Sequence, residues 1–436
     1  MKRISVLLSL CICLGLLGCN QKATKEPETS NGQETLSAEM TEGLMTEKNS
    51  AVDYTVTTQY DHDRATCHPQ TRCAMTEDTV YFLTSMYHTG TSCSLCYYDK
   101  RTGSSGPLCG KAECLHNNAD CDAYIGNNFA GQGLSYYDGK LYILRESESS
   151  SNCFQILSVN TDGTGRKEIR EVELPAYMSG SLDDRYVQFH RGYMFFSGTS
   201  YQVEDGIQYN ITYLYAYPLE SDERITLYEQ KWQSGAAYYS IVPQPVGNQA
   251  YYMISQRETG DDGTESYLMD IRKWNLNTKA EETVYSGGVD AMPYQYWVDE
   301  EEILVSGYVC GKIYSLKNGS AELTEKFGYD SLFIADFCDG WVVHYNNADE
   351  PVLNRTHLEI DRFDGEIIYR EELPEYMEYP ETGMFLTSTL CGLDEKNAYF
   401  YCFKREETYS EEHLIVHPLN GDEAIIVWSN CSSVKI

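Results

Sequence analysis

Apolar and aromatic residues gather in short runs along the chain, and polar turns separate these runs. Seven of the runs begin a repeated phrase, and each is made of β-branched or aromatic residues that favour strands. Several follow a tight-turn signal such as Asp138-Gly139 or Asp339-Gly340, where a hairpin places residues with positive φ. The runs are residues 79–87, 140–146, 193–198, 250–256, 302–307, 341–346 and 398–403.

Each run is followed by a second strand, and nearly all of these end in Gly, Asn or Asp; in most repeats a third strand follows. In the first repeat we expect a cysteine-rich loop, residues 106–124, in place of the third strand. An innermost strand, such as residues 331–337, precedes the unit and brings it to four strands. Repeats spaced by about 39 to 61 residues with this content indicate a β-propeller. The predicted fold class is therefore all-β, a β-propeller of seven four-stranded blades over residues 51–436.

A propeller has to close its ring. Alternating β-forming residues at 51–61 are predicted to complete the last blade from the N-terminal side. Two packed β-sandwiches are the alternative architecture for so many short strands.

The N-terminus carries the most specific motif. Lys2 and Arg3 precede an apolar run at 4–17, which is too short to span a bilayer and is typical of an export signal. The run ends in Leu16-Leu17-Gly18-Cys19, a lipobox. We predict a signal peptide at 1–18 and, at 19–50, a polar tether without aromatic residues that cannot bury a core. An ordinary secretory signal is the alternative.

Two features resemble a known family. The turn phrase at 156–163 and the Asp-Gly-Lys-Leu-Tyr phrase at 138–142 are similar to the repeats of TolB-like and WD40-like propellers of bacterial surface lipoproteins. The signal also resembles theirs, which implies that Cys19 becomes the lipidated first residue and anchors the protein on the extracytoplasmic face of the cell membrane. This chain has no Trp-Asp pair of the WD40 type, no Gly-Gly doublets at kelch spacing and no sialidase-style Asp-box, so no catalytic residue of those families can be carried over to it.

Composition and motifs limit the classes of function that the protein can have. The formal net charge is −33, which makes nucleic acid an unsuitable partner. The sequence has no GxSxG elbow, HExxH motif, phosphate loop or dinucleotide fingerprint. We therefore predict non-catalytic binding of an extracellular ligand or envelope protein. The alternatives are a glycoside hydrolase or lyase acting on extracellular glycans, whose paired carboxylates leave no linear motif, and an envelope scaffold with an apolar outer patch.

Cysteine supplies the local chemical signal. The chain has 16 cysteines, three of them in or next to the signal peptide, so an odd number remains. Cys109, Cys114, His116 and Cys121 lie together in the cysteine-rich loop and supply a donor set suited to structural zinc. Disulfides, a metal site and free thiols all remain open for this group. Five cysteines further along the chain are expected to be small buried hydrophobes: Cys310, Cys338, Cys391, Cys402 and Cys431.

Cys93 and Cys96 have CxxC spacing but lie in a predicted strand. Residues three apart in a strand point to opposite faces, so each needs its own partner, such as Cys67, Cys73 or the loop.

Tyrosine is abundant, with 37 residues against 13 Phe. Aromatic side chains near a propeller channel suit stacking against sugars or peptides, although core packing is the commoner role. The ligand-binding candidates are Tyr136, Tyr238, Tyr294, Tyr296 and Trp297.

Overall fold

The computed structural model describes residues 72–433, apart from 85–91, 117–119, 128–130, 138, 148–152, 174–185, 234–236, 261, 300, 308–311, 329–334, 339, 347–356, 373–384 and 406–408. Residues Ala51–Ile436 form one compact unit. The described residues contain strands and turns but no helix, and hence no helix that could cross a membrane. The predicted signal peptide, Cys19, the tether at 19–50, the strand at 51–61 and Cys67 all lie outside the described residues.

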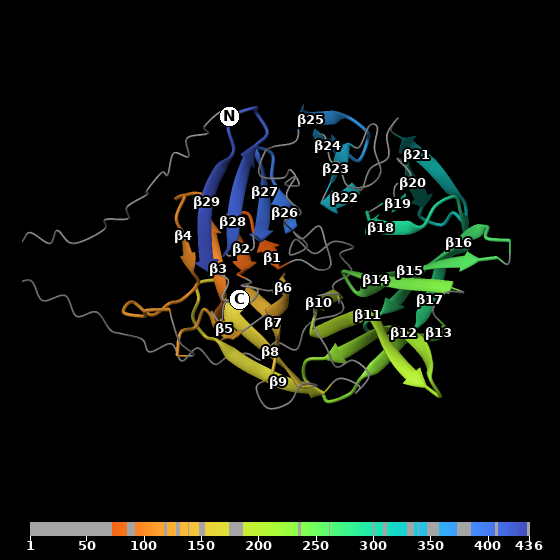
Figure 1. The fold of residues 1–436 in the computed structure, drawn as a ribbon, viewed down its shortest axis with the longest axis horizontal. Helices are drawn as coiled ribbons and strands as arrows, with labels where there is room; N and C mark the ends of the chain where they lie inside the picture. The colour runs from red at the N-terminus through yellow and green to blue at the C-terminus, as the bar shows by residue number, and fades with distance from the viewer. Residues whose placement is uncertain are drawn as a thin grey trace, which may run out of the picture. The chain divides into compact units, whose positions relative to one another are not determined.

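The strands form seven sheets, which Figure 1 shows arranged as blades. Their bounds, blade by blade, are β1 (Cys73–Met75), β2 (Thr79–Leu83), β3 (Ser92–Asp99), β4 (Ser105–Pro107) and β5 (Tyr124–Asn127); β6 (Gly131–Tyr137), β7 (Lys140–Glu146), β8 (Cys153–Asn160) and β9 (Lys167–Glu173); β10 (Tyr186–His190), β11 (Tyr193–Glu204), β12 (Ile207–Pro218) and β13 (Ile225–Gln233); β14 (Ala237–Val246), β15 (Gln249–Thr259), β16 (Glu265–Asn275) and β17 (Glu281–Val289); β18 (Pro293–Val298), β19 (Glu302–Gly307), β20 (Lys312–Lys317) and β21 (Leu323–Gly328); β22 (Ala335–Cys338), β23 (Trp341–Asn346), β24 (His357–Arg362) and β25 (Ile367–Glu372); β26 (Phe385–Leu393), β27 (Asn397–Arg405), β28 (Tyr409–Pro418) and β29 (Ile425–Ser433).

Neighbouring strands follow one another in chain order and pair antiparallel in every sheet, except that β5 of the first sheet pairs with β3. The innermost strands contact each other in the order β1, β6, β10, β14, β18, β22 and β26, and β26 contacts β1 again. These contacts close a ring of seven blades. The predicted seven-bladed propeller is confirmed, and the alternative of two β-sandwiches is wrong.

Hairpin turns have the backbone that the turn signals predict. Gly139 and Gly340 have φ of 72° and 84°. Arg191 and Gly192, between β10 and β11, have φ of 43° and 76°, and two consecutive positive values are what a type I′ turn requires. Local sequence therefore sets the connection between the two inner strands of these blades.

The core lies between neighbouring blades, because both faces of each sheet are covered. One cluster joins Leu83 and Leu95 of the first blade to Leu141 and Leu157 of the second. Another joins Phe82 of the first blade to Tyr399 and other residues of the last blade. Alternation along each strand thus sends apolar side chains to two different interfaces.

The first blade differs from its expected form. A third strand is present, the short β4, which pairs with the C-terminal half of β3. β5 pairs with the N-terminal part of the same β3 strand, so the outer edge is divided between two short strands. The cysteine-rich loop lies between β4 and β5 and does not replace the strand.

A disulfide joins Cys73 on β1 to Cys391 on β26, across 318 positions of sequence. Their Cα atoms are 5.2 Å apart, within the range that disulfides span. Cys391 is buried, as predicted, but it also forms a disulfide, because ring closure brings the innermost strands of the first and last blades together. The prediction that Cys73 pairs with Cys93 or Cys96 is therefore wrong. The last blade already contains four strands of its own from residues 385–433.

The disulfide should stabilise the ring by constraining the unfolded chain. We expect C391A to lower the free energy of unfolding by about 2–5 kcal/mol in denaturant titrations without reductant. A matched control is C402A, which removes a buried thiol of the same blade that forms no disulfide. Reductant should lower the free energy of unfolding of wild type towards that of C391A, and it should leave the difference that C402A causes unchanged. An unchanged gap between wild type and C391A in reductant would contradict the prediction.

Candidate metal centre

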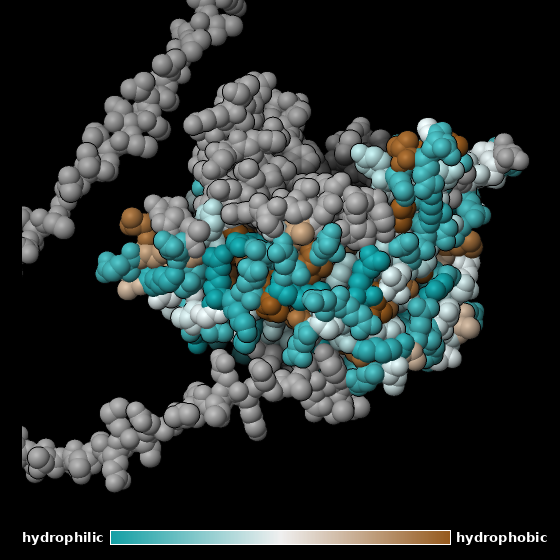
Figure 2. Space-filling model, turned by 90° about the horizontal axis from the view of Figure 1, so that it is seen from below, coloured by the Kyte–Doolittle hydropathy of each residue, from teal (hydrophilic) through white to brown (hydrophobic). Residues whose placement is uncertain are grey.

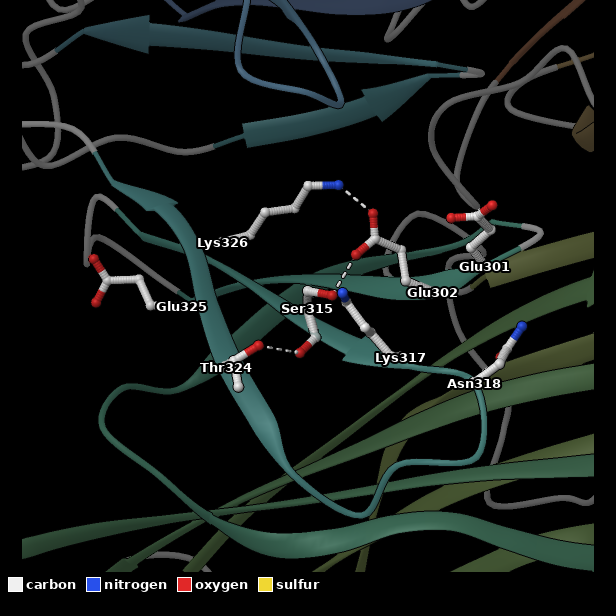
Figure 3. Close-up of a pocket in the computed structure, with 8 residues that line it drawn as sticks. All are labelled: Glu301, Glu302, Ser315, Lys317, Asn318, Thr324, Glu325 and Lys326. Carbon is white, nitrogen blue, oxygen red and sulfur yellow. Dashed lines mark hydrogen bonds and ion pairs between the residues drawn. The ribbon is translucent and has the colours of Figure 1, made fainter.

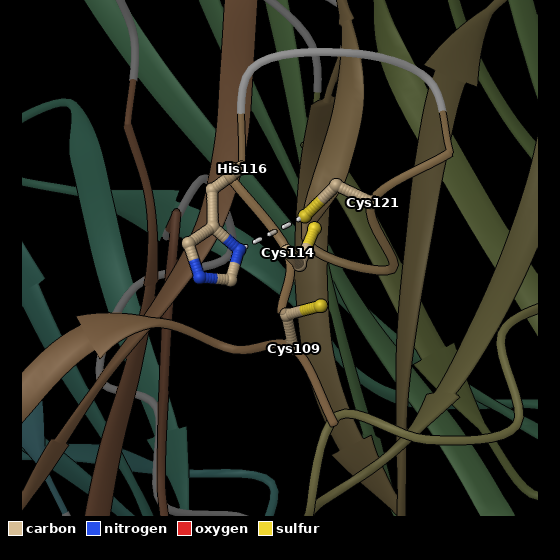
Figure 4. A group of neighbouring side chains, drawn as sticks. All are labelled: Cys109, Cys114, His116 and Cys121. Carbon is tan, nitrogen blue, oxygen red and sulfur yellow. Dashed lines mark hydrogen bonds between the residues drawn. The ribbon is translucent and has the colours of Figure 1, made fainter. Parts of the chain in front are cut away.

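Three thiols and one imidazole meet in the cysteine-rich loop of the first blade. Figure 4 shows Cys109, Cys114 and Cys121 with their sulfur atoms turned towards one another and His116 beside them. The ligand atoms of all four residues lie within 4.8 Å of one another. His116 Nδ1 is 3.3 Å from Cys121 Sγ, and the three thiols form no disulfide. Residues predicted as one group from their spacing are therefore brought together.

Hydrogen bonds to a single residue of β3 hold both ends of this loop. Leu108 N–H donates to the carbonyl of Leu95 over 2.8 Å, and Leu95 N–H donates to the carbonyl of Ala123 over 2.8 Å. The loop therefore leaves the sheet and returns to it at the same position. That closure brings Cys109 and Cys121 close together, because they lie just inside the two ends.

The turn between β8 and β9 of the second blade packs against the loop. A Cβ atom on Gly163 would lie 2.8 Å from Cys109 N, so only glycine permits this approach. Gly110 N–H donates to the carbonyl of Gly163 over 3.3 Å. The position of Cys109 is thus fixed from two blades.

The thiols have different electrostatic surroundings. Burial acts to raise the pKa of Cys109, but backbone N–H groups of Lys111 and Asp122 donate to its sulfur, and the net pKa is lowered. Burial raises the pKa of Cys121 to about 12. Backbone donors to sulfur stabilise a thiolate, the form that binds metal.

His116 has φ of 54°, a left-handed conformation uncommon for a non-glycine residue. This conformation directs the ring at Cys121. Backbone strain of this kind is concentrated at functional sites. Three sulfurs and one imidazole nitrogen are a tetrahedral zinc donor set, so the residues present fit a zinc ion.

The other cysteine candidates lie outside this group. Cys93 and Cys96 pack in different core clusters, one towards the second blade and one towards the last, as expected for residues on opposite faces of β3. Cys93 Sγ donates to the carbonyl of Thr84 over 2.8 Å. Burial raises the pKa of Cys96 well above its usual value, which suits a neutral core thiol.

The five aromatic residues predicted to bind ligand differ in how deeply they are buried. Tyr296 and Trp297 are 4% and 1% exposed and pack in blade cores. Tyr136 is half-buried against the core between the first two blades, and Tyr294 is half-buried on β18. Tyr238 is 43% exposed, which leaves it the most accessible of the five candidates. Its role in ligand binding stays a prediction.

A second group with metal-binding residue types is enclosed in the sixth blade. His344 on β23 lies 3.1 Å from Asp361 and 3.3 Å from Glu359, both on β24, and all three are almost fully buried. Arg370 Nε lies 3.1 Å from the other oxygen of Glu359. Sequence reasoning missed this group.

The charged residues of the group around His344 shift each other's pKa values. Burial acts to lower the pKa of His344, but hydrogen bonds and charge from Asp361 and Glu359 outweigh it and raise the pKa. Burial acts to raise the pKa of Glu359, and its bond to His344 lowers it overall. When His344 is protonated, its charge and that of Arg370 cancel the charges of Asp361 and Glu359, and such a neutral network suits packing between blades.

The fifth blade carries an open polar pocket of about 520 Å³, drawn in Figure 3. The Glu302 carboxylate accepts hydrogen bonds from Ser315 and from Lys326, whose side chains point at it. Thr324 Oγ1 donates to the carbonyl of Ser315 over 3.4 Å. The central carboxylate is therefore engaged by its neighbours.

Fold and site together define a seven-bladed propeller with a candidate metal-binding group in its first blade. No family model matches the sequence, and no curated protein matches it. Similar solved structures exist. An acylaminoacyl peptidase from Pyrococcus horikoshii has 13% identity and a TM-score of 0.46, over 85% of this chain and 54% of the peptidase. This chain thus spans about half the length of that enzyme.

The β-propeller domain of the Trilobed protease from Pyrococcus furiosus has 13% identity and a TM-score of 0.45, over 82% of this chain and 97% of the domain. A putative 6-phosphogluconolactonase from Bacteroides fragilis has 13% identity and a TM-score of 0.38, over 83% of this chain and 98% of that chain. These values are too low to assign any activity to this chain. The resemblance to TolB-like lipoproteins stays a prediction.

The enclosed network in the sixth blade should make stability depend on pH. Because the folded-state pKa of His344 is above 6.5, its contribution is fully present below pH 6.5 and is lost as the pH rises through the folded-state value. The lowered pKa of Glu359 makes its contribution present above pH 4.5 and lost as the pH falls through its folded-state value.

Urea unfolding of wild type, H344Q and H413Q from pH 5 to pH 9 measures this dependence. We expect the free energy of unfolding of wild type to fall above pH 6.5 relative to H344Q. His413 is a partly exposed histidine in the last blade, so H413Q should keep the wild-type profile. Parallel profiles for wild type and H344Q would exclude this role for His344.

Proposed function

We propose that this protein is a lipid-anchored propeller on the extracytoplasmic face of the cell membrane that binds a ligand or partner protein and catalyses no reaction. A zinc ion held by Cys109, Cys114, His116 and Cys121 would order the loop beside its binding surface. The observation that carries the zinc site is that this group supplies four protein ligand atoms within 4.8 Å, and the lipobox that ends at Cys19 supports the anchor.

Four protein ligands fill a tetrahedral zinc site. Catalytic zinc sites keep one position for water or substrate, whereas closed sites stabilise structure. A loop whose ends meet at Leu95 has little core of its own, since its buried cluster consists of Cys121, Ala123 and Tyr124 with Cys109 and Cys114 against them. Metal binding would supply the stabilising free energy that this small cluster lacks.

The enclosed position of the histidine–carboxylate group also favours binding over catalysis. His344, Glu359 and Asp361 are the residue types of acid–base catalysis, but their side chains are at most 2% exposed. A substrate would have to separate two blades to reach them. Release of reducing or unsaturated sugars from extracellular glycans by the purified protein would favour the alternative, a glycoside hydrolase or lyase.

Surface chemistry supports a soluble domain held at a membrane by its anchor. Figure 2 shows one face on which most described residues are hydrophilic and apolar residues occur in small separate groups. A large apolar patch, the expectation for an envelope scaffold, is not seen among the described residues of that face. The net charge of −33 favours solubility and argues against nucleic acid as a partner.

Metal analysis tests the zinc site. We expect the exported C19A chain to carry about one zinc ion in native mass spectrometry, and chelation to remove it with a fall in melting temperature. C121S should lose the metal. C153S, which removes an unbonded and partly exposed thiol outside the group, should retain it. A mass deficit matching disulfides among the loop cysteines, without metal, would overturn the site.

Fractionation tests the anchor. Wild type should partition with membranes and incorporate labelled fatty acid, because acyl chains on Cys19 provide stable anchoring. C19A should appear in the soluble fraction without label. The control C67A changes a cysteine outside the lipobox and should behave as wild type. Membrane association of unlabelled C19A would contradict lipid anchoring.

A further inference from the structure

A pocket of about 350 Å³ lies between the cysteine-rich loop and the second blade. Its size suits a small ligand or one group of a larger one. The charged residues that line it are Lys111, Asp120, Asp122, Arg145, Arg166 and Glu168. It is separate from the four sulfur and nitrogen atoms of the candidate zinc site, although the same loop forms one of its walls.

Two arginines of the second blade are fixed at this pocket by neutral acceptors. Arg145 Nε donates to Gln155 Oε1 over 2.6 Å, and its Nη1 donates to the carbonyl of Ile125 over 3.0 Å. Arg166 Nη1 donates to the carbonyl of Cys121 over 2.9 Å. Both guanidinium groups are thus tied to the segment that ends the cysteine-rich loop, and both retain N–H groups for another acceptor.

Neither arginine forms an ion pair with a carboxylate within the part of the chain that the structure describes, although Asp122 is close enough to Arg166 for their charges to interact. The nearby Asp122 carboxylate is paired with Lys111 Nζ over 3.1 Å. The chain has 66 acidic residues against 33 basic ones, so an arginine can readily find a carboxylate. Arg272, for example, lies within 4 Å of both Asp270 and Glu281. Arg145 and Arg166 are half-buried guanidinium groups without such an ion pair among the described residues, although three carboxylates line the same pocket.

Arg145 and Arg166 place two positive charges at one pocket. Charge repulsion of this kind costs free energy that a bound anion would recover. Fixed guanidinium groups also lose little conformational entropy on binding and match the planar geometry of oxyanions.

We propose that Arg145 and Arg166 bind a single oxyanion group, a carboxylate, phosphate or sulfate, in the pocket beside the cysteine-rich loop. Asp120 and Glu168 line the same pocket and would repel a second anionic group, which favours a ligand that presents one such group. This inference rests on the proposed binding function and adds a ligand class to it. The loop wall also explains why ordering of the loop would matter for binding.

Isothermal titration of the zinc-loaded, exported C19A chain at low ionic strength tests the site. The probes are inorganic phosphate, sulfate and glucuronate, which separate a phosphate or sulfate group from a sugar carboxylate. We expect at least one probe to bind, and R145Q and R166Q each to weaken it by about tenfold or more. The matched control is R257Q, an arginine of the fourth blade that is paired with Glu265 and should not affect binding.

Metal content is measured on every variant, since Arg166 contacts the carbonyl of a zinc-ligand candidate. Arg145 contacts Ile125 instead, so R145Q decides the outcome if R166Q loses metal. Binding of no probe by wild type, or equal binding by wild type and R145Q, would overturn the anion site. If zinc is retained in either of these cases, only the anion site is wrong, and the proposed binding function stands. If the probe binds in a way that depends on the arginines but the protein carries no zinc, the proposed zinc site is wrong and the anion site stands.

Discussion

The innermost strands of the first and last blades contact each other, and the ring of sheets depends on that contact. Each blade buries two faces only if it has a neighbour on both sides. Phe82, Tyr399 and Leu414 fill the interface where the ring closes, and the Cys73–Cys391 disulfide links the two strands covalently. Without this closure, two blades would each expose a large apolar face.

Much of the fold could be predicted from local sequence. Strand content follows from β-branched and aromatic runs, and turns such as Arg191-Gly192 fix the hairpins that divide them. What could not be predicted depends on contacts across the ring. Cys391 has apolar neighbours in sequence, and so does Cys402, which forms no disulfide; only ring closure places Cys73 beside Cys391.

The candidate sites also differ in how far local sequence indicates them. The ligand set of the cysteine-rich loop is local, so its residue types and spacing indicated it. His344, Glu359 and Asp361 were missed because Leu358 and Ile360 alternate with the two carboxylates along β24, a pattern typical of a strand with one wet face. Packing against the fifth blade covers that face. Arg145 and Arg166 were missed because distant carbonyl groups hold them.

The attachment of the cysteine-rich loop at Leu95 has a consequence for how such a protein can diversify. Because the segment from Leu108 to Ala123 begins and ends on one residue of β3, its length is independent of the strand register on either side. Doubling a flexible loop costs only about 0.6 kcal/mol in closure entropy. The loop can therefore be replaced by segments of other lengths and sequences while the strands of the first blade keep their pairing.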